Sequence, residues 1–224
     1  MSSKVKKKRK IGSNFAYDFV KVTGAIPALL WFRVKTIRAN ENVPKRYKKG
    51  VVFAVNHTSF LDPIIVHCVL WYRRLNFLAT KELFKTERKL KFFQRMHCIP
   101  IDKQNFNISA VHAVRDRLKE EKAIVIFPEG TVNREEGTLE NYKSGAVFMA
   151  HMAKKPLVPV YIVKGKKWYN RTVAVIGEPI DTTTICGKVP KMADLDNASE
   201  YLKQKEEELR EIYNQRYKNK KKKD

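Results

Sequence analysis

The sequence predicts an α/β fold, a single domain in which a mainly parallel mixed sheet is flanked by helices. Short apolar runs of strand length alternate along the chain with amphipathic runs of helix length, and this alternation is typical of βαβ units. The chain has 224 residues, of which 43% are hydrophobic. That is enough apolar material to bury a core without disulfides or a structural metal, and too much for a disordered chain.

The first element is expected to be an amphipathic helix at residues 15–37, kinked at Pro27. Apolar side chains recur there at helical spacing, Trp31 and Phe32 end the apolar stretch, and cations flank it on both sides. Two placements remain open. The helix lies in the interface of a membrane, or its apolar face packs on the core of the domain.

The same segment is not expected to cross a bilayer or to act as a secretory signal. Asp18, Lys21 and Arg33 interrupt it. Its longest apolar run, residues 25–32, falls far short of the roughly 20 residues that a spanning helix needs.

The remaining elements follow in order along the chain. The first apolar run lies between Gly50 and Asn56 and is typical of a buried strand, and Pro63 suits the first turn of the helix that follows it. Strands are expected at residues 51–55, 75–79, 99–101, 123–127, 157–163 and 172–176. Helices are expected at residues 63–74, 83–96, 109–121, 143–154 and 198–217.

The chain is strongly basic, with 46 Lys and Arg against 23 Asp and Glu and a net charge of +23. About half of this excess lies in basic tails at residues 1–14 and 216–224. Such a surface attracts a nucleic acid, an anionic lipid surface or an acidic protein. The cysteines, Cys68, Cys98 and Cys186, are odd in number and too far apart for a CxxC pair, which fits a reducing compartment without a disulfide framework.

Several familiar motifs are missing from the sequence. The glycines form no dinucleotide-binding fingerprint and no phosphate-binding P-loop. Neither a nucleophilic-serine elbow nor a zinc-binding HExxH pattern occurs. The sequence therefore gives no support for a bound nucleotide, a metal ion or a nucleophilic serine.

Two polar clusters stand at the ends of predicted strands. Residues 56–62 (NHTSFLD) follow the first strand, and residues 128–131 (PEGT) follow the strand at 123–127. Ligands of open α/β sheets bind outside the carboxyl ends of strands, so we expect both clusters at one edge of the sheet. Within the first cluster, His57 can act as a general base that Asp62 orients and stabilises.

A structural interpretation competes with the catalytic one. Ser59 and Asp62 have the spacing of a capping box at the start of the following helix, and His57 can be an ordinary turn residue. The other histidines lack a carboxylate in a comparable position and are expected in the core or on the surface. They are His67, His97, His112 and His151.

Four blocks of the sequence, taken in order, resemble the glycerolipid acyltransferases. They are NHTSFLD at 56–62, IPIDK at 99–103, FPEGT at 127–131 and VPV at 158–160. One block alone is a weak signal, but all four in this order with the usual spacing are specific. The resemblance is greatest to the bacterial 1-acyl-sn-glycerol-3-phosphate acyltransferases, and it implies an acyltransferase domain at 38–215 with a fold like that of glycerol-3-phosphate acyltransferase.

The resemblance implies that an acyl chain moves from a thioester of acyl carrier protein or coenzyme A to the sn-2 hydroxyl of lysophosphatidic acid, giving phosphatidic acid. His57 would take the hydroxyl proton and Asp62 would hold the imidazole. No acyl-enzyme, no metal and no cofactor beyond the acyl donor is expected. Another lysophospholipid or glycerol 3-phosphate is the alternative acceptor.

The resemblance also implies a site for the glycerophosphate, formed by Lys103, Glu129 and Gly130. Lys103 stands where the family has an arginine, and it offers a point charge without the bidentate fork. Because a carboxylate repels a phosphate, we expect Glu129 to order its loop or to bridge to Lys103 or Arg134. Further contributions are expected from Asn56, Ser59, Thr131, Arg134 and Lys143.

Two other positions carry expectations from the same resemblance. His97 replaces the glycine that usually opens the second block, so the local backbone geometry is open to question. Pro159, in the fourth block, is expected to shape a loop and a wall for the acyl chain.

In this interpretation the positive charge and the N-terminal helix hold a peripheral enzyme on the anionic surface of the cytoplasmic face of a membrane. A basic nucleic-acid-binding domain is the competing interpretation, because cations alternate with aromatic residues at 71–74 and 166–169. That interpretation gives no reason for the two polar clusters, so we expect no nucleic-acid partner.

Overall fold

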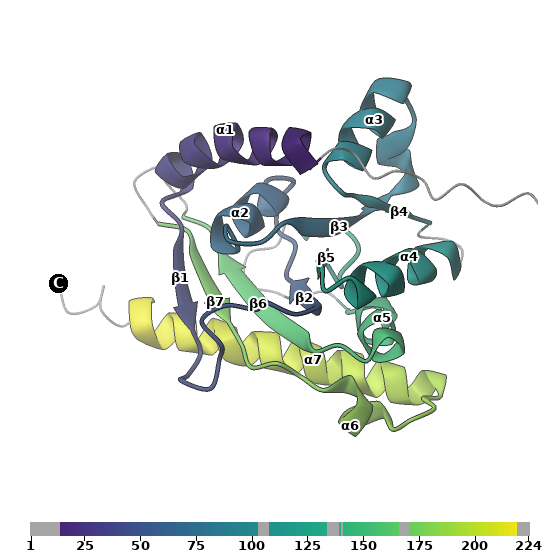
Figure 1. Ribbon diagram of the computed structural model, residues 1–224. Coiled ribbons are helices and arrows are strands. Elements are labelled where there is room, and N and C mark those ends of the chain that lie inside the picture. Colours follow the sequence, from purple (N-terminus) through teal and green to yellow (C-terminus); the bar gives the residue numbers. More distant parts are fainter. Residues whose placement is uncertain (1–13, 103–107, 134–138, 140, 166–170, 219–224) are drawn as a thin grey trace, which may run out of the picture.

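A computed structural model describes residues 14–102, 108–133, 139, 141–165 and 171–218 of the chain. Within this part, seven strands form one sheet in the order β1-β7-β6-β2-β5-β3-β4 (Figure 1). Neighbouring strands are parallel except β6 and β7. The strands are β1 (Lys35–Arg38), β2 (Val51–Val55), β3 (Leu75–Thr80), β4 (Ile99–Ile101), β5 (Ala123–Ile126), β6 (Leu157–Val163) and β7 (Val173–Ile176).

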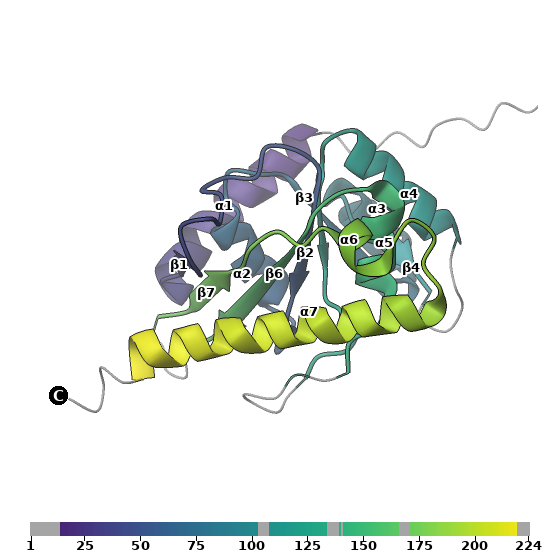
Figure 2. The ribbon, with the colours of Figure 1, turned by 90° about the horizontal axis from the view of Figure 1, so that it is seen from below.

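Helices cover both faces of the sheet, with α1 and α2 on one face and α4, α5 and α7 on the other (Figure 1). Figure 2 shows α7 lying along the whole of its face. The α-helices are α1 (Asn14–Phe32), α2 (Asp62–Val69), α3 (Glu87–Arg95), α4 (Ile108–Lys119), α5 (Gly145–Ala153), α6 (Thr182–Cys186) and α7 (Met192–Tyr213). A 3₁₀ turn, η1 (Lys81–Phe84), precedes α3, and a π turn, η2 (Asn214–Lys218), follows α7.

The alternation of side chains along β2 shows how the two cores arise. Phe53 and Val55 pack with α2, whereas Val52 and Ala54 pack with α4, α5 and α7. All residues of β2 are buried, which explains why this strand reads as a continuous apolar run rather than an alternating one. The predicted α/β fold with a mainly parallel mixed sheet is confirmed.

Several predicted boundaries are wrong. The first helix ends at Phe32 rather than residue 37, and Lys35–Arg38 form β1, a strand that was not predicted; the short helix α6 was not predicted either. The segment 83–96 contains a break, because Thr86 caps a new helix by accepting a hydrogen bond from Lys89 N–H. The last helix begins at Met192, where the Asp194 carboxylate accepts from Lys191 N–H.

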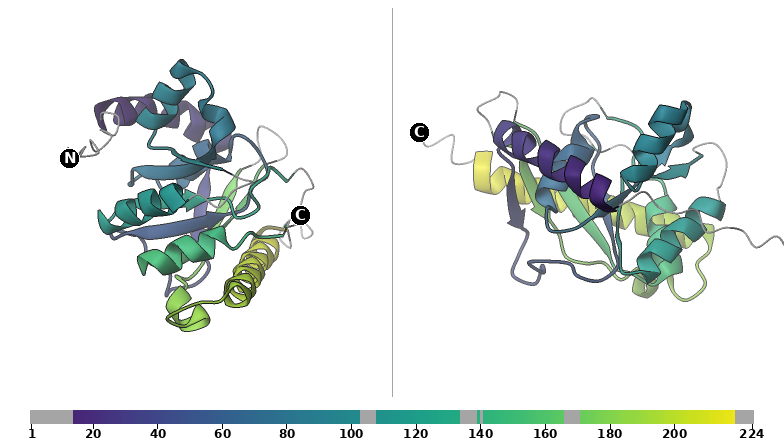
Figure 3. Two further views of the ribbon diagram at one scale, coloured as in Figure 1. Left: turned by 90° about the vertical axis from the view of Figure 1, so that its right-hand side faces the viewer. Right: turned by 45° about the horizontal axis from the view of Figure 1, so that its top comes forward.

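Helix α1 packs on the outer side of α2, which Figure 3 shows from a second direction. Tyr17 is fully buried, and its hydroxyl accepts a hydrogen bond from Leu75 N–H at 2.7 Å. Lys21 donates to the Trp71 carbonyl, and Asp18 pairs with Arg74 at 2.6 Å. One stripe of α1 therefore packs on the domain, while most of its apolar side chains face outward.

By length and composition alone, α1 could cross a membrane. Its contacts along α2 are those of a helix that packs on its own domain, which is one of the two placements left open by the sequence. Its placement in a membrane interface stays a prediction. The buried stripe faces the domain and the apolar outer stripe is free to face a lipid surface.

Candidate active site

The first polar cluster forms a histidine–aspartate pair at the edge of the sheet where β2, β5 and β6 end, which we name the C-terminal edge. His57 follows β2, and Asp62 is the first residue of α2. His57 Nδ1 lies 2.9 Å from Asp62 Oδ2. Among the described residues none bonds to the other ring nitrogen, Nε2, so that atom is available to a substrate proton.

Asp62 is fully buried and accepts hydrogen bonds from several directions. Its Oδ2 accepts from the backbone N–H groups of Thr58 and Ser59, each at 2.7 Å, and Lys164 Nζ lies 3.0 Å from Oδ1. Burial raises the pKa of Asp62, but the bonds from His57, Ser59 and Lys164 outweigh it and hold the pKa below 3.8. The carboxylate is therefore ionised at neutral pH and holds the ring of His57.

The capping-box and catalytic interpretations both hold in part. Asp62 Oδ2 accepts from Ser59 N–H, the bond that the acidic residue of a capping box makes, although Leu61 stands at the N-cap position of α2 and makes no side-chain capping bond. The same oxygen lies 2.9 Å from His57 Nδ1, so the side chain that ties down the start of α2 also orients the imidazole.

The second polar cluster packs against the first. Glu129 is buried, and its Oε1 accepts from the backbone N–H of His57 at 2.9 Å. Asn133 N–H donates back to the His57 carbonyl at 2.7 Å. Glu129 thus orders the loop, one of its two expected roles, and the ring of His57 stacks on Phe127 with centroids 4.2 Å apart.

The turn after β5 places Gly130 beside a lysine. Gly130 N–H donates to the Phe127 carbonyl and has a φ of 71°, a conformation that favours glycine. A Cβ at this position would lie 3.4 Å from the side chain of Lys143, whose own N–H bonds to the Pro128 carbonyl. The side chain of Lys143 therefore lies beside this turn, and its role in binding a phosphate stays a prediction.

The remaining predicted site residues have different settings. The amide of Asn56 is buried, donates to the Ile162 carbonyl and accepts from the Ile162 N–H, so it joins β2 to β6 rather than facing a substrate. Ser59 Oγ accepts from Leu61 N–H but keeps its own hydrogen to donate, and Thr131 is exposed. Lys103 and Arg134 lie outside the described residues.

Lys164 is the member of the site that sequence reasoning missed. It follows β6, so it lies at the same edge as His57, and it pairs with the Asp62 carboxylate. The one sequence feature that could have identified Lys164 as a site residue is its position directly after the strand that contains the fourth block. Pairing with a residue 102 positions earlier depends on the order of strands, which composition does not reveal.

The other histidines behave as expected of core and surface residues. His67 contacts Tyr17 and the Pro63 carbonyl, and burial lowers its pKa to about 4. His151 is buried and His112 is exposed. His97 has a φ of 58° and stacks on Tyr17, so it adopts the left-handed conformation for which the family's glycine is suited.

No group of three or more metal-ligating side chains occurs within the described ranges. All three cysteines are free, in line with the absence of a disulfide framework.

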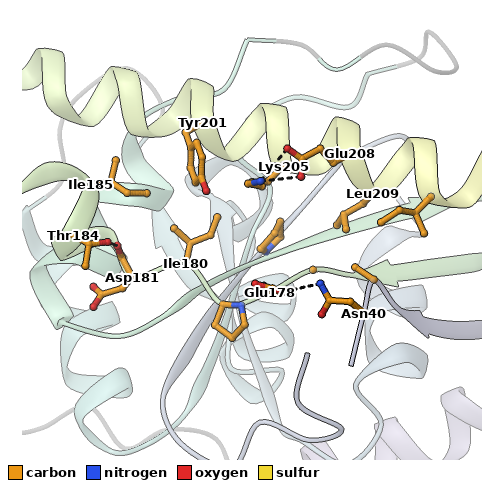
Figure 4. A pocket seen from close by; sticks show the side chains of 15 residues that line it. Asn40, Glu178, Ile180, Asp181, Thr184, Ile185, Tyr201, Lys205, Glu208 and Leu209 are labelled. Carbon is orange, nitrogen blue, oxygen red and sulfur yellow. Dashed lines mark hydrogen bonds and ion pairs between the residues drawn. The ribbon is translucent and has the colours of Figure 1, made fainter. Parts of the chain in front are cut away.

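A hollow of about 380 Å³ lies away from the pair, between α7 and the segment after β7 (Figure 4). Its polar groups already pair with each other, as Asn40 does with Glu178 and Lys205 with Glu208. Because β7 is antiparallel to β6, the segment after β7 is at the opposite edge from His57. Pro159 lies within β6 and lines this hollow, so the expectation that it shapes a loop is wrong, and its expected role as a wall for the acyl chain stays a prediction.

A histidine that a buried carboxylate orients, at the C-terminal edge of a helix-flanked sheet, is the arrangement of an enzyme active site that works by acid–base chemistry. The sequence profile of the family described as Acyltransferase matches residues 35–163, more than half of the chain. The chain belongs to the acyltransferase family, and it is an acyltransferase.

Named relatives agree with this assignment. The 1-acyl-sn-glycerol-3-phosphate acyltransferase of Bacillus subtilis is 31% identical over 174 residues, which cover 75% of this chain and 84% of the relative. The probable 1-acyl-sn-glycerol-3-phosphate acyltransferase of Mycoplasma pneumoniae is 34% identical over 155 residues, covering 65% of this chain and 56% of the relative. The crystal structure of the 1-acyl-sn-glycerophosphate acyltransferase of Thermotoga maritima shares the fold, with a TM-score of 0.61, 19% identity, and coverage of 89% of this chain and 82% of that one.

Proposed function

We propose that this enzyme transfers an acyl chain from a thioester, of acyl carrier protein or coenzyme A, to the sn-2 hydroxyl of 1-acyl-sn-glycerol 3-phosphate, and that phosphatidic acid is the product. The observation that carries the proposal is the oriented His57, with a free Nε2, beside the Gly130 turn with its lysine. The names of the relatives support the choice of acceptor.

The chemistry needs one base and no covalent enzyme intermediate. His57 Nε2 takes the proton of the acceptor hydroxyl while its oxygen attacks the thioester carbonyl. The tetrahedral intermediate collapses with loss of the thiolate, which takes the proton back from the imidazolium. The ionised Asp62 stabilises the imidazolium in between and fixes its tautomer, since it accepts from Nδ1.

The acceptor's phosphate is assigned to the cations around the Gly130 turn. Lys143 is the described member of this group. Lys103 is assigned to it from the second sequence block, and Arg134 from its position downstream of the third. A phosphomonoester carries more negative charge than a phosphodiester, so a cluster of cations favours lysophosphatidic acid over lysophospholipids with a neutral net headgroup. Glycerol 3-phosphate carries the same phosphate as lysophosphatidic acid, so the cations do not distinguish these two acceptors. They differ in the acyl chain, which glycerol 3-phosphate lacks.

The enzyme's place is assigned to the cytoplasmic face of a membrane, as a peripheral protein. The outward stripe of α1 and the net charge of +23 support attachment to an anionic lipid surface.

The test is an acyl-transfer assay of the purified chain with both thioester donors and a panel of acceptors, comparing the parent with His57→Ala. We expect activity with lysophosphatidic acid, and a loss of about 10²- to 10⁴-fold in kcat for His57→Ala, because the general base is removed. His112→Ala, at an exposed histidine on α4, is the matched control and should retain full activity. An active, folded His57→Ala protein would overturn the mechanism, and turnover of other acceptors alone would overturn the substrate.

A further inference from the structure

Large apolar side chains stand exposed next to the catalytic histidine. Phe60 is 79% exposed and Leu61 46% exposed, and both lie in the loop between His57 and α2. Ile64, in the first turn of α2, is also exposed. Exposed apolar side chains that gather at one place mark a surface that meets an apolar partner.

The loop that carries these side chains is fixed, not free to fold its apolar groups inward. The Asp62 carboxylate accepts from the N–H groups of Thr58 and Ser59, and the Ser59 hydroxyl accepts from Leu61 N–H. Three hydrogen bonds therefore hold the backbone on both sides of Phe60 in the position that exposes its ring.

Helix α1 brings a second group of exposed apolar side chains to the same edge of the sheet. The N-terminal half of α1 contacts the end of α2 and the start of β3, through Tyr17 and Lys21. Its last residue, Phe32, bonds through its carbonyl to Thr172 N–H, just before β7, and β7 begins beside the end of β6. The two helices are therefore antiparallel, and α1 ends at the C-terminal edge, where α2 begins.

The end of α1 is as exposed as the catalytic loop. Leu30 is 75% exposed and Trp31 is 69% exposed. We name Leu30, Trp31, Phe60, Leu61 and Ile64 the apolar rim. Arg33 and Lys35 come soon after Leu30 and Trp31 in the sequence, so cations border the α1 part of the rim. Apolar side chains bordered by cations suit the boundary between anionic headgroups and acyl chains.

We propose that the catalytic loop is itself a membrane-inserting element, in which Phe60 and Leu61 enter an anionic bilayer beside the end of α1. Insertion there places the His57–Asp62 pair at the boundary of the bilayer, where the acceptor's hydroxyl lies. The inference rests on the proposed function for the identity of the acceptor, but the contact between loop and bilayer does not depend on turnover.

The test compares Phe60→Ser/Leu61→Ser with the parent, in binding to vesicles of phosphatidylglycerol and phosphatidylcholine and in turnover of two acceptors. One acceptor is a long-chain lysophosphatidic acid in those vesicles, and the other is a short-chain analogue below its critical micelle concentration. Val189→Ser/Met192→Ser is the matched control, because these are exposed apolar residues at the start of α7.

We expect the loop variant to bind vesicles about 10- to 100-fold more weakly and to lose vesicle turnover by about the same factor. Turnover of the short-chain acceptor should stay within about twofold, and the control should match the parent throughout. Unchanged vesicle binding would overturn the inference. An equal loss of turnover with both acceptors would assign Phe60 and Leu61 to acceptor binding instead. A higher KM for acyl carrier protein alone would make the apolar rim a docking surface for that carrier. A shift in oligomeric state would make it a contact between copies of this chain.

The outcome for the proposed function is separate. A parent protein that is inactive with both acceptors would defeat the proposed function, while the vesicle-binding comparison would still decide the inference.

Discussion

At the scale of single residues, Asp62 is a buried carboxylate between two basic side chains from different elements. His57 comes from the end of β2 and Lys164 from the end of β6. Lys164 Nζ lies 3.0 Å from Oδ1, the carboxylate oxygen that His57 does not contact, so the buried carboxylate has a second basic partner besides the imidazole. Lys164 is thus a positioning residue that acts through Asp62.

The Lys164→Met variant tests this role. Loss of one charged partner leaves the buried carboxylate less satisfied, at a cost of about 1.5–3 kcal/mol, and we expect kcat to fall by about tenfold or more with little change in KM for the acyl donor. Lys155→Met is the control, because Lys155 pairs with Glu121 at the opposite edge of the sheet, before β6 and β5 begin. Initial-rate kinetics of the parent and both variants measure this effect. If the Lys164→Met variant had the same kcat as the parent, Lys164 would have no positioning role.

Glu206, on α7, is a further buried carboxyl group with an identifiable task. It is fully buried, and its Oε2 accepts from the Tyr142 hydroxyl at 2.6 Å. Tyr142 precedes Lys143, so this bond ties the segment at the phosphate turn to α7. Burial raises the pKa of Glu206 well above 4.5, and the Tyr142 bond lowers it only in part while the Glu129 charge raises it further.

A raised pKa in the folded state has a definite sign for stability. Above about pH 4.5 the unfolded chain loses the Glu206 proton while the folded chain keeps it, so the folded state becomes less favourable as pH rises through this window. Glu206→Gln keeps an acceptor for Tyr142 and removes the titration. We expect the variant to gain stability relative to the parent between pH 5 and pH 8, by up to about 1.4 kcal/mol per pH unit.

Urea unfolding at several pH values measures this gain. Glu200→Gln, at an exposed position of the same helix, should run parallel to the parent across the range. Parallel curves for the Glu206→Gln variant as well would show that the folded protein holds Glu206 ionised.

At the scale of elements, the sequence predicted what local pattern determines and missed what pairing determines. The buried strands β2, β5 and β6 appear as apolar runs, so their polar successors, including His57 and Glu129, could be placed at one edge. Strand β1 (KTIR) has no such pattern, because it is a half-exposed edge strand that exists through its register with β7. The Asp62–Lys164 and Asn56–Ile162 contacts were hidden for the same reason.

The conformation of His97 shows a different limit. The sequence shows only that a histidine stands where the resembling family has a glycine. The structure shows that His97 nevertheless adopts the left-handed backbone conformation after α3. Stacking on Tyr17, with centroids 4.5 Å apart, helps to offset the strain that a side chain suffers there. That compensation comes from α1, about 80 residues earlier, and no local pattern contains it.

At the scale of the whole molecule, the net charge of +23 is divided between the folded domain and two tails. Residues 1–13 contain six cations and no acidic residue, and they directly precede α1. Each Lys or Arg near an anionic bilayer contributes about 1 kcal/mol of attraction, which is screened within a Debye length. We therefore expect the tail to strengthen attachment to such a bilayer by charge, and the apolar stripe of α1 to strengthen it by burial.

A chain lacking residues 1–13 separates the two contributions. We expect its affinity for vesicles with phosphatidylglycerol to fall by at least about tenfold at low salt, and to converge with that of the full chain near 0.5 M salt, where the Debye length is about 4 Å. Turnover of a monomeric short-chain acceptor should be unchanged, because this acceptor reaches the enzyme from solution without a membrane. Vesicle sedimentation over a salt series gives the salt dependence of binding for the truncated and the full chain. A full chain whose first 13 residues are scrambled is the control and should bind like the parent, because this attraction depends on charge and not on residue order. Equal affinity of the truncated and full chains at low salt would mean that the apolar surface alone holds the enzyme on the membrane.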